Sequence, residues 1–172
     1  MAILPELETA RLSLRRLEYN DARFIVRLLN EPSFIENIGD RDVRSIDDAH
    51  RYLREGPIAM YEAHGFGLWH VARLSDGAAL GMCGLLKRDN LPDVDIGYAF
   101  LPEHWGMGYA FEAAEATMRH GAAKFGLERV TAVVSQGNAA SIRLLEKLGL
   151  RYERMFAMHP GEAEVRLYGR PL

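Results

Sequence analysis

Residues 93–113 constrain this chain most, because they read in direct succession as a strand, a short turn and a glycine-rich helix start. Apolar side chains alternate from Val94 to Phe100, which is the period of a β-strand. Pro102 ends the strand because proline lacks the N–H that a ladder needs. Small residues recur at helical spacing after Gly106 and Gly108. Since the first turn of a helix has unpaired N–H groups and the positive end of the dipole, the stretch predicts an anion site suited to phosphate.

The glycine turn does not match the common nucleotide motifs. It lacks the Gly-Lys-Ser/Thr ending of a P-loop, and the third glycine of a dinucleotide fingerprint is absent. Two glycines one residue apart also occur in turns that only join a strand to a helix. The turn alone therefore leaves three interpretations open: a linker without a ligand, an unrelated phosphate-binding α/β protein, and a more specific site.

The string PEHWGMGYAFEA, at residues 102–113, closely resembles the acetyl-coenzyme A (acetyl-CoA) binding motif Q/R-x-x-G-x-G/A of the GNAT N-acetyltransferase superfamily. In this register Trp105 takes the Q/R place, Gly108 the glycine and Ala110 the last small residue. The tryptophan is a departure that resembles the W-G-x-G-Y-A variant of the branch with the ribosomal-protein-alanine acetyltransferases. Residues 138–150 resemble the second signature of the superfamily and TARLSLRRL resembles its first strand. The resemblance covers essentially the whole chain.

The resemblance implies an α/β fold and a single N-acetyltransferase domain over residues 1–172. We expect a mixed, largely antiparallel sheet with helices on both faces. The strands at residues 93–100 and 129–135 are expected to splay apart and open a central V-shaped cleft for the cofactor.

The hydrophobic pattern predicts the element order β-α-α-β-β-β-α-β-α-β-β. Predicted caps open helices at Asn20, Ser45 and Asn138. Pro32 is expected to end the first helix, residues 34–42 to form a loop, and Gly56-Pro57 to break the second helix. The strands are predicted at residues 11–17, 66–73, 79–87, 93–100, 129–135, 150–156 and 163–169.

Composition sets the broad class. With 172 residues, 48% of them apolar, the chain is long enough for one domain with a real core. A net charge of −3 without a basic block argues against nucleic-acid binding. The single cysteine, Cys83, excludes an internal disulfide and suits a reducing compartment. The chain shows no signal-peptide pattern and no membrane-length apolar run, so we expect a cytoplasmic protein without membrane partners.

The resemblance implies acetyl-CoA as co-substrate and no metal. The backbone of the glycine turn would hold the pyrophosphate, and the edge of the strand before it would pair with the amide-bearing arm. Asn138 matches an asparagine that hydrogen-bonds the arm in the family. The predicted cofactor-binding residues are Tyr98, Phe100, Leu101, Trp105, Gly106, Met107, Gly108, Tyr109, Ala110 and Asn138.

Two residues are predicted to take part in proton transfer during the reaction. Asp95 aligns with the acidic residue, usually Glu, that many relatives carry on this strand, and it would act as the base, directly or through water. Many relatives have a tyrosine on the helix after the asparagine, where this chain has Leu144 and Leu145. Ser141 is the nearest hydroxyl and would hydrogen-bond or protonate the coenzyme sulfur, with Tyr152 or solvent as other sources. The structural alternatives are a solvated or salt-bridged carboxylate at Asp95 and a helix-surface serine at Ser141.

The region after the first strand lies beside the acceptor site in the resembling family. The predicted substrate-binding residues there are Phe34, Asn37, Ile38 and Arg41, with Asp40 as a neighbour. A solvated loop that touches no substrate is the alternative. A histidine on a strand, His70, and Cys83 in an apolar strand are interpreted as structural residues.

The leading interpretation is an N-acetyltransferase that moves the acetyl group from acetyl-CoA to a primary amine by direct attack in a ternary complex. A protein N-terminus and small-molecule amines are both open as acceptors, and the chain is expected to be a monomer or homodimer. The alternative is a catalytically weak CoA-binding sensor or regulatory module.

Overall fold

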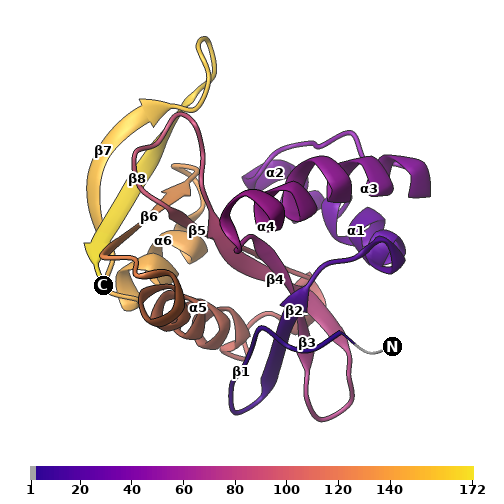
Figure 1. The fold of residues 1–172 in the computed structure, drawn as a ribbon. Coiled ribbons are helices and arrows are strands. Elements are labelled where there is room, and N and C mark those ends of the chain that lie inside the picture. Colours follow the sequence, from indigo (N-terminus) through magenta and orange to yellow (C-terminus); the bar gives the residue numbers. More distant parts are fainter. Residues whose placement is uncertain (1–2) are drawn as a thin grey trace.

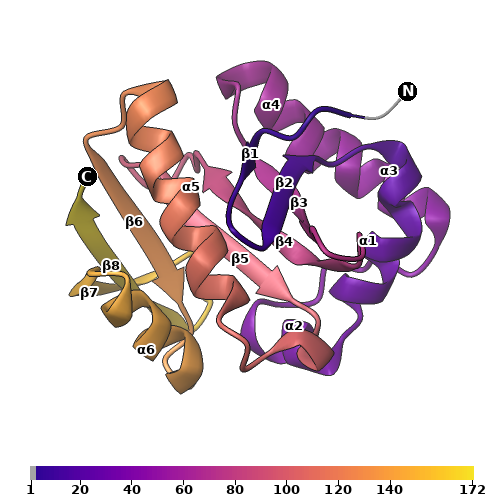
Figure 2. The ribbon, with the colours of Figure 1, turned by 90° about the horizontal axis from the view of Figure 1, so that it is seen from below.

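One mixed sheet of eight strands organises residues 3–172, which the computed structural model describes (Figure 1). The strand order is β1-β2-β3-β4-β5-β6-β8-β7. Neighbouring strands are antiparallel except for β5 and β6, which are parallel. The predicted fold class, an α/β fold with a largely antiparallel sheet and helices on both faces, is confirmed (Figure 2).

The elements follow the predicted order with a few additions. Among residues 3–172, no helix is long and apolar enough to cross a membrane. The strands are β1 Leu7–Glu8, β2 Leu12–Arg16, β3 Leu68–Arg73, β4 Ala79–Leu86, β5 Asp95–Phe100, β6 Arg129–Val134, β7 Arg151–Ala157 and β8 Glu164–Pro171. The helices are α1 Ala22–Leu29, α2 Pro32–Asn37, α3 Ile46–Leu53, α4 Ala59–His64, α5 Tyr109–Phe125 and α6 Ala139–Lys147, with short turns η1 Tyr19–Asp21, η2 Arg54–Ile58 and η3 Pro102–His104.

The parallel pair β5 and β6 separates almost as soon as it forms. Its register contains one pair, Asp95 with Thr131, and the Thr131 N–H donates to the Val94 carbonyl at 3.0 Å. On its other side β5 stays paired with β4 as far as Phe100. One edge of β5 is therefore free of strand partners beyond Asp95, and the predicted V-shaped cleft is confirmed.

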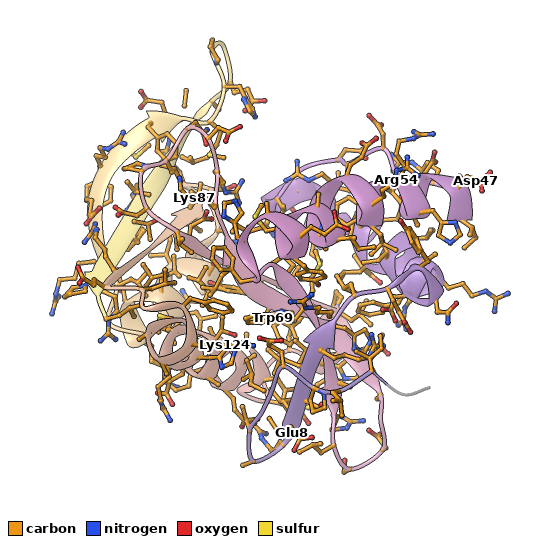
Figure 3. All side chains as sticks on the ribbon, viewed as in Figure 1. Glu8, Asp47, Arg54, Trp69, Lys87 and Lys124 are labelled. Carbon is orange, nitrogen blue, oxygen red and sulfur yellow. The ribbon has the colours of Figure 1, made fainter. Side chains whose placement is uncertain are left out.

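Two apolar clusters pack on the two faces of the sheet. One lies under α5 and α6, with Trp69 fully buried near the centre of the molecule (Figure 3). The other lies under α1, α2 and α3 and includes Ala99 and Leu101. Successive β5 residues alternate between these clusters, as the sequence pattern predicts. On α5, Ala113 and Ala114 are fully buried, so the helix approaches β4 and β5 closely.

The region between β2 and β3 departs from the prediction. Residues 34–42 were predicted as a loop, but α2 runs over Pro32–Asn37 with Pro32 in its first turn. Proline is tolerated there because the first N–H groups of a helix have no intrahelical partner. Pro32 therefore opens a helix instead of ending one, since α1 has already ended at Leu29.

Two further corrections concern helix boundaries. The predicted cap Asn20 lies inside η1, where Glu18 and Asp21 form the capping box. Gly56-Pro57 does not break the helical path, because the π turn η2 absorbs Pro57 and leads into α4. The predicted caps Ser45 and Asn138 are confirmed, each accepting a backbone N–H three residues on.

Candidate functional site

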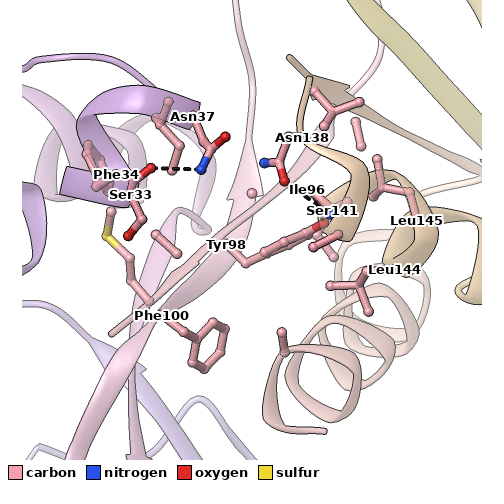
Figure 4. Close-up of a pocket in the computed structure, with 18 of the residues that line it drawn as sticks. Ser33, Phe34, Asn37, Ile96, Tyr98, Phe100, Asn138, Ser141, Leu144 and Leu145 are labelled. Carbon is pink, nitrogen blue, oxygen red and sulfur yellow. Dashed lines mark hydrogen bonds between the residues drawn. The ribbon is translucent and has the colours of Figure 1, made fainter. Parts of the chain in front are cut away.

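A cavity of about 460 Å³ occupies the gap where β5 and β6 diverge (Figure 4). Its walls come from α1 and α2, from β5, from the turn before α5, from the end of β6 and from the start of α6. The cavity brings together most of the predicted site residues: Phe34, Asn37, Ile38, Arg41, Asp95, Tyr98, Phe100, Trp105, Gly106, Gly108, Tyr109, Ala110, Asn138 and Ser141.

The turn before α5 presents an array of backbone donors to the cavity. Gly106 and Gly108 adopt φ angles of 77° and 80°, a left-handed conformation that favours glycine. The first helical hydrogen bond runs from the Glu112 N–H to the Gly108 carbonyl at 3.1 Å. Within the part of the chain that the structure describes, the N–H groups of residues 106–111 have no protein acceptor. Unpaired donors at a helix start fit the pyrophosphate of coenzyme A.

Side chains from the N-terminal region fix this turn. Arg11 donates from Nη1 to the Met107 carbonyl at 2.9 Å and from Nε to Glu112 Oε1 at 2.8 Å. Thr9 Oγ1 donates to Glu112 Oε2 at 2.6 Å. Burial raises the pKa of Glu112, but these hydrogen bonds outweigh it and leave the pKa below its usual value. The partners of Glu112 lie more than 100 positions away in the chain, so no local sequence pattern indicates them.

Asn138 and Ser141 stand together at the start of α6. Asn138 Oδ1 accepts the Ser141 N–H at 3.2 Å, and both residues line the cavity (Figure 4). The Tyr98 hydroxyl reaches from β5 to within 2.6 Å of Ser141 Oγ. Burial raises the pKa of Tyr98 to about 12, and the hydrogen bond to Ser141 opposes the rise. Tyr98 is therefore a neutral phenol at physiological pH.

Asp95 lies where β5 and β6 last pair, and it is 1% exposed. Arg88 Nε lies 3.1 Å from each of its carboxylate oxygens. Burial raises the pKa of Asp95 to about 6, although the Arg88 charge and hydrogen bonds lower it. Asp95 and Tyr98 project from opposite faces of β5, since they are three residues apart on a strand. Arg88 also lines the cavity, and no local sequence pattern marks it as a site residue.

The side of the cavity where the substrate-binding residues were predicted is formed mainly by α2. Ser135 Oγ donates to the Asn37 carbonyl at 2.8 Å, which joins α2 to the end of β6. Asn37 Nδ2 donates to the Ser33 carbonyl at 3.0 Å. Phe34 is buried, Ile38 is exposed at the rim, and the remaining apolar lining includes Leu28, Tyr52, Met82 and Leu86.

Some predicted residues lie elsewhere. Leu101 is fully buried under α1–α3, and Met107 is half exposed; neither lines the cavity. Asp40 is held by Arg44 at 2.6 Å, also outside the lining. Tyr152 is on the exposed face of β7.

His70 and Cys83 lie in the core and do not line the cavity. Burial lowers the pKa of His70 to about 4, with Arg15 adding to the effect. Burial raises the pKa of the Cys83 thiol to about 12, and its sulfur lies 3.6 Å from Thr117 Oγ1. Both residues have the surroundings of structural side chains.

The chain is similar to known acetyltransferases in sequence and in fold. The profile of the acetyltransferase (GNAT) domain matches residues 11–151. The uncharacterized protein YkkB of Bacillus subtilis (strain 168) is 32% identical over 153 residues, which are 87% of each chain. The uncharacterized N-acetyltransferase YoaA of the same organism is 31% identical over 152 residues, covering 88% of this chain and 85% of YoaA.

A solved structure agrees at the level of the fold. RimL, a ribosomal L7/L12 alpha-N-protein acetyltransferase in complex with coenzyme A, superposes with a TM-score of 0.82. The match covers 99% of this chain and 98% of that chain at 17% identity. Fold, cavity and family profile agree, and the chain belongs to the GNAT acetyltransferase family.

Proposed function

We propose that the protein is an N-acetyltransferase that moves the acetyl group of acetyl-CoA to a primary amine by direct attack in a ternary complex. One observation carries the proposal: a single cavity joins the unpaired N–H groups before α5, the free edge of β5 and the buried carboxylate of Asp95. The coenzyme supplies a thioester, and the remaining chemistry belongs to this chain.

The donor half of the cavity has a feature for each part of coenzyme A. Backbone N–H groups of residues 106–111 would bind the pyrophosphate, and the Arg11–Glu112 pair holds that turn in place. The β5 edge beyond Asp95 offers backbone groups to the amides of the arm, as an added strand would. Asn138 has an amide at the same wall.

The acceptor half supports a base and a site for the amine. Asp95 would take the proton that the attacking nitrogen loses, directly or through water. A carboxylate with a pKa of about 6 is mostly ionised at neutral pH and still basic enough to serve. Backbone N–H groups at the end of β5 would polarise the carbonyl. Phe34, Asn37, Ile38 and Arg41 would contact the acceptor.

An α-amine is the acceptor class that this site suits best. At neutral pH roughly a tenth of an α-amine with a pKa near 7.7–8.0 is neutral, against well under a thousandth of a lysine with a pKa near 10.4. Asp95 is partly neutralised by Arg88, so it is a modest base. RimL, which shares the fold, is named as an alpha-N-protein acetyltransferase.

A thiol-release assay tests the proposal. Acetyl-CoA is offered with alaninamide, which has only an α-amine, and with an Nα-acetylated lysine amide, which has only an ε-amine. We expect faster release with the α-amine, by about tenfold or more, because more of it is neutral. If no amine releases thiol above the rate of hydrolysis, the transferase proposal fails; acetyl-CoA binding without turnover would then favour the sensor alternative.

A further inference from the structure

The hydroxyl groups of Tyr98 and Ser141 form a pair that joins the two sides of the cavity. Tyr98 comes from β5 and Ser141 from the first turn of α6, and their oxygens are 2.6 Å apart (Figure 4). Both residues line the cavity. The contact joins elements 43 positions apart in the chain, so packing of the sheet against α6 creates it.

The direction of this hydrogen bond follows from the chemistry of the two groups. Each hydroxyl has one hydrogen and can donate once. A phenol is a much stronger acid than an alcohol, so the favoured arrangement has Tyr98 donating to Ser141 Oγ. The hydrogen of Ser141 is then left free to point into the cavity. Since Ser141 Oγ already accepts a hydrogen bond, its own hydrogen becomes a better donor, because linked hydrogen bonds polarise one another.

We infer that Tyr98 is a positioning residue for acetyl transfer, which holds the Ser141 hydroxyl so that it donates a hydrogen bond to the departing coenzyme sulfur. This inference rests on the proposed function. Leu144 and Leu145 on the same helix carry no hydroxyl, and the Tyr98 phenol reaches this helix from the opposite wall.

The step balances without a net proton from the pair. The C–N bond forms and the C–S bond breaks. The nitrogen loses one proton to Asp95, and the sulfur, which leaves as a thiolate, gains one from water. The Ser141 hydroxyl stabilises the sulfur while it carries negative charge, and Tyr98 stays protonated throughout. Asp95 and Tyr98 are on opposite faces of β5, so the nitrogen proton is accepted on one side of the gap and the sulfur is stabilised on the other.

The test compares Tyr98→Phe, Ser141→Ala and the double variant, with Tyr19→Phe on the exposed η1 turn as the matched control. We expect Tyr98→Phe to lower kcat by roughly 5- to 10-fold, the effect of one hydrogen bond, with little change in KM for acetyl-CoA. The double variant should be no slower than Ser141→Ala, because Tyr98 acts through Ser141. Tyr19→Phe should match the parent protein.

Leaving-group dependence separates this role from a structural one. The selenoester analogue of acetyl-CoA has the same shape but leaves as a far more acidic selenol, so the loss in Tyr98→Phe should shrink to about twofold or less. The inference is overturned if Tyr98→Phe lowers kcat by the same factor with acetyl-CoA and with the selenoester. It is also overturned if the losses in kcat of the two single variants add in the double variant. Either result leaves the transferase proposal intact. Absence of turnover by the parent protein with any amine would remove both, and a normal kcat in Tyr98→Phe would remove the inference alone.

Discussion

At the scale of single residues, Asp95 shows how burial and a charged partner act against each other. Removing a carboxylate from water favours its protonated form, whereas the Arg88 guanidinium favours the ionised form. Burial prevails and the pKa rises to about 6. A buried ion pair on the cavity floor therefore also has the protonation behaviour of a base that works near neutral pH.

Replacing Asp95 by Asn keeps the shape and removes the base. We expect kcat/KM for an α-amine to fall by about a hundredfold or more, with the dissociation constant of acetyl-CoA nearly unchanged. In the parent protein kcat/KM should rise as the pH rises through about 6, because only the carboxylate accepts a proton. The variant should lack this limb, which steady-state kinetics over a pH series will measure.

Asp93→Asn is the matched control for that experiment. Asp93 lies two positions earlier, is part-exposed and pairs with Arg129 at 3.3 Å. This variant should keep both the rate and the limb near pH 6. An Asp95→Asn protein that melts normally and keeps the limb would show that another group is the base.

Single residues also show which parts of the candidate site could be predicted from the sequence. Asp95, Asn138 and Ser141 are identified from the motif resemblance, and all three line the cavity. Arg88 is missed because it follows the end of β4 in an irregular segment without a local signal. The contact between Tyr98 and Ser141 is also missed, since only the packed fold brings a strand residue to a helix start 43 positions later.

At the scale of elements, helix starts are set by local chemistry, which sequence patterns report well. The capping box at Ser45 is an example: its hydroxyl accepts the Asp48 N–H at 3.0 Å, and Asp48 Oδ2 accepts the Ser45 N–H at 3.1 Å. The α2 helix is the contrasting case, because proline is compatible with both a helix end and a first turn. Tertiary packing of Phe34 under the sheet decides between them.

Removing the Ser45 cap should destabilise the protein measurably. We expect Ser45→Ala to lower the free energy of unfolding by about 1 kcal/mol, because the Asp48 N–H loses its acceptor. Chemical denaturation with an unchanged slope will measure the loss. Ser75→Ala, in the exposed turn between β3 and β4, is the control and should be neutral; equal stabilities of the two variants would refute the cap's contribution.

At the scale of the whole molecule, the sheet and its two apolar clusters follow from strand periodicity, and the cavity follows from one short parallel register. Antiparallel pairing continues on both outer sides of β5 and β6, so the gap between them is held open by the rest of the sheet. The splaying of β5 from β6 was expected from the family resemblance. The position of α2 at the wall of the cavity could not be inferred, because residues 34–42 were predicted as a loop.

The free energy of unfolding should depend on pH through His70, whose ring packs against Phe24 at 5.2 Å between centroids. Its folded pKa of about 4 lies below the usual 6.5, so the folded state resists protonation. The stability that the folded state gains from a neutral His70 is fully present above about pH 6.5 and is lost as the pH falls toward 4. From pH 7 to 5, the parent protein should lose about 2 kcal/mol more stability than His70→Gln.

Denaturation at the two pH values measures that difference, and the opposite effect of Asp95 cancels because both proteins contain it. His159→Gln, on the exposed turn between β7 and β8, should behave like the parent protein. If His70→Gln loses as much stability on acidification as the parent protein, the buried histidine is not the acid-sensitive group.

The measurement that bears most directly on this account is calorimetric titration of acetyl-CoA into the parent protein, Gly106→Asp and Gly77→Asp. Both glycines have left-handed φ angles, 77° at Gly106 and 73° at Gly77, and a Cβ atom at either would meet no protein atom within 4 Å. The backbone strain of the substitution is therefore the same at both positions, but of these two glycines only Gly106 lines the cavity.

We expect the parent protein and Gly77→Asp to bind acetyl-CoA at one site and with equal affinity. Gly106→Asp should bind at least about tenfold more weakly, because its carboxylate would face the pyrophosphate. No binding by the parent protein, or equal binding by Gly106→Asp, would contradict the assignment of the turn before α5 as the pyrophosphate site.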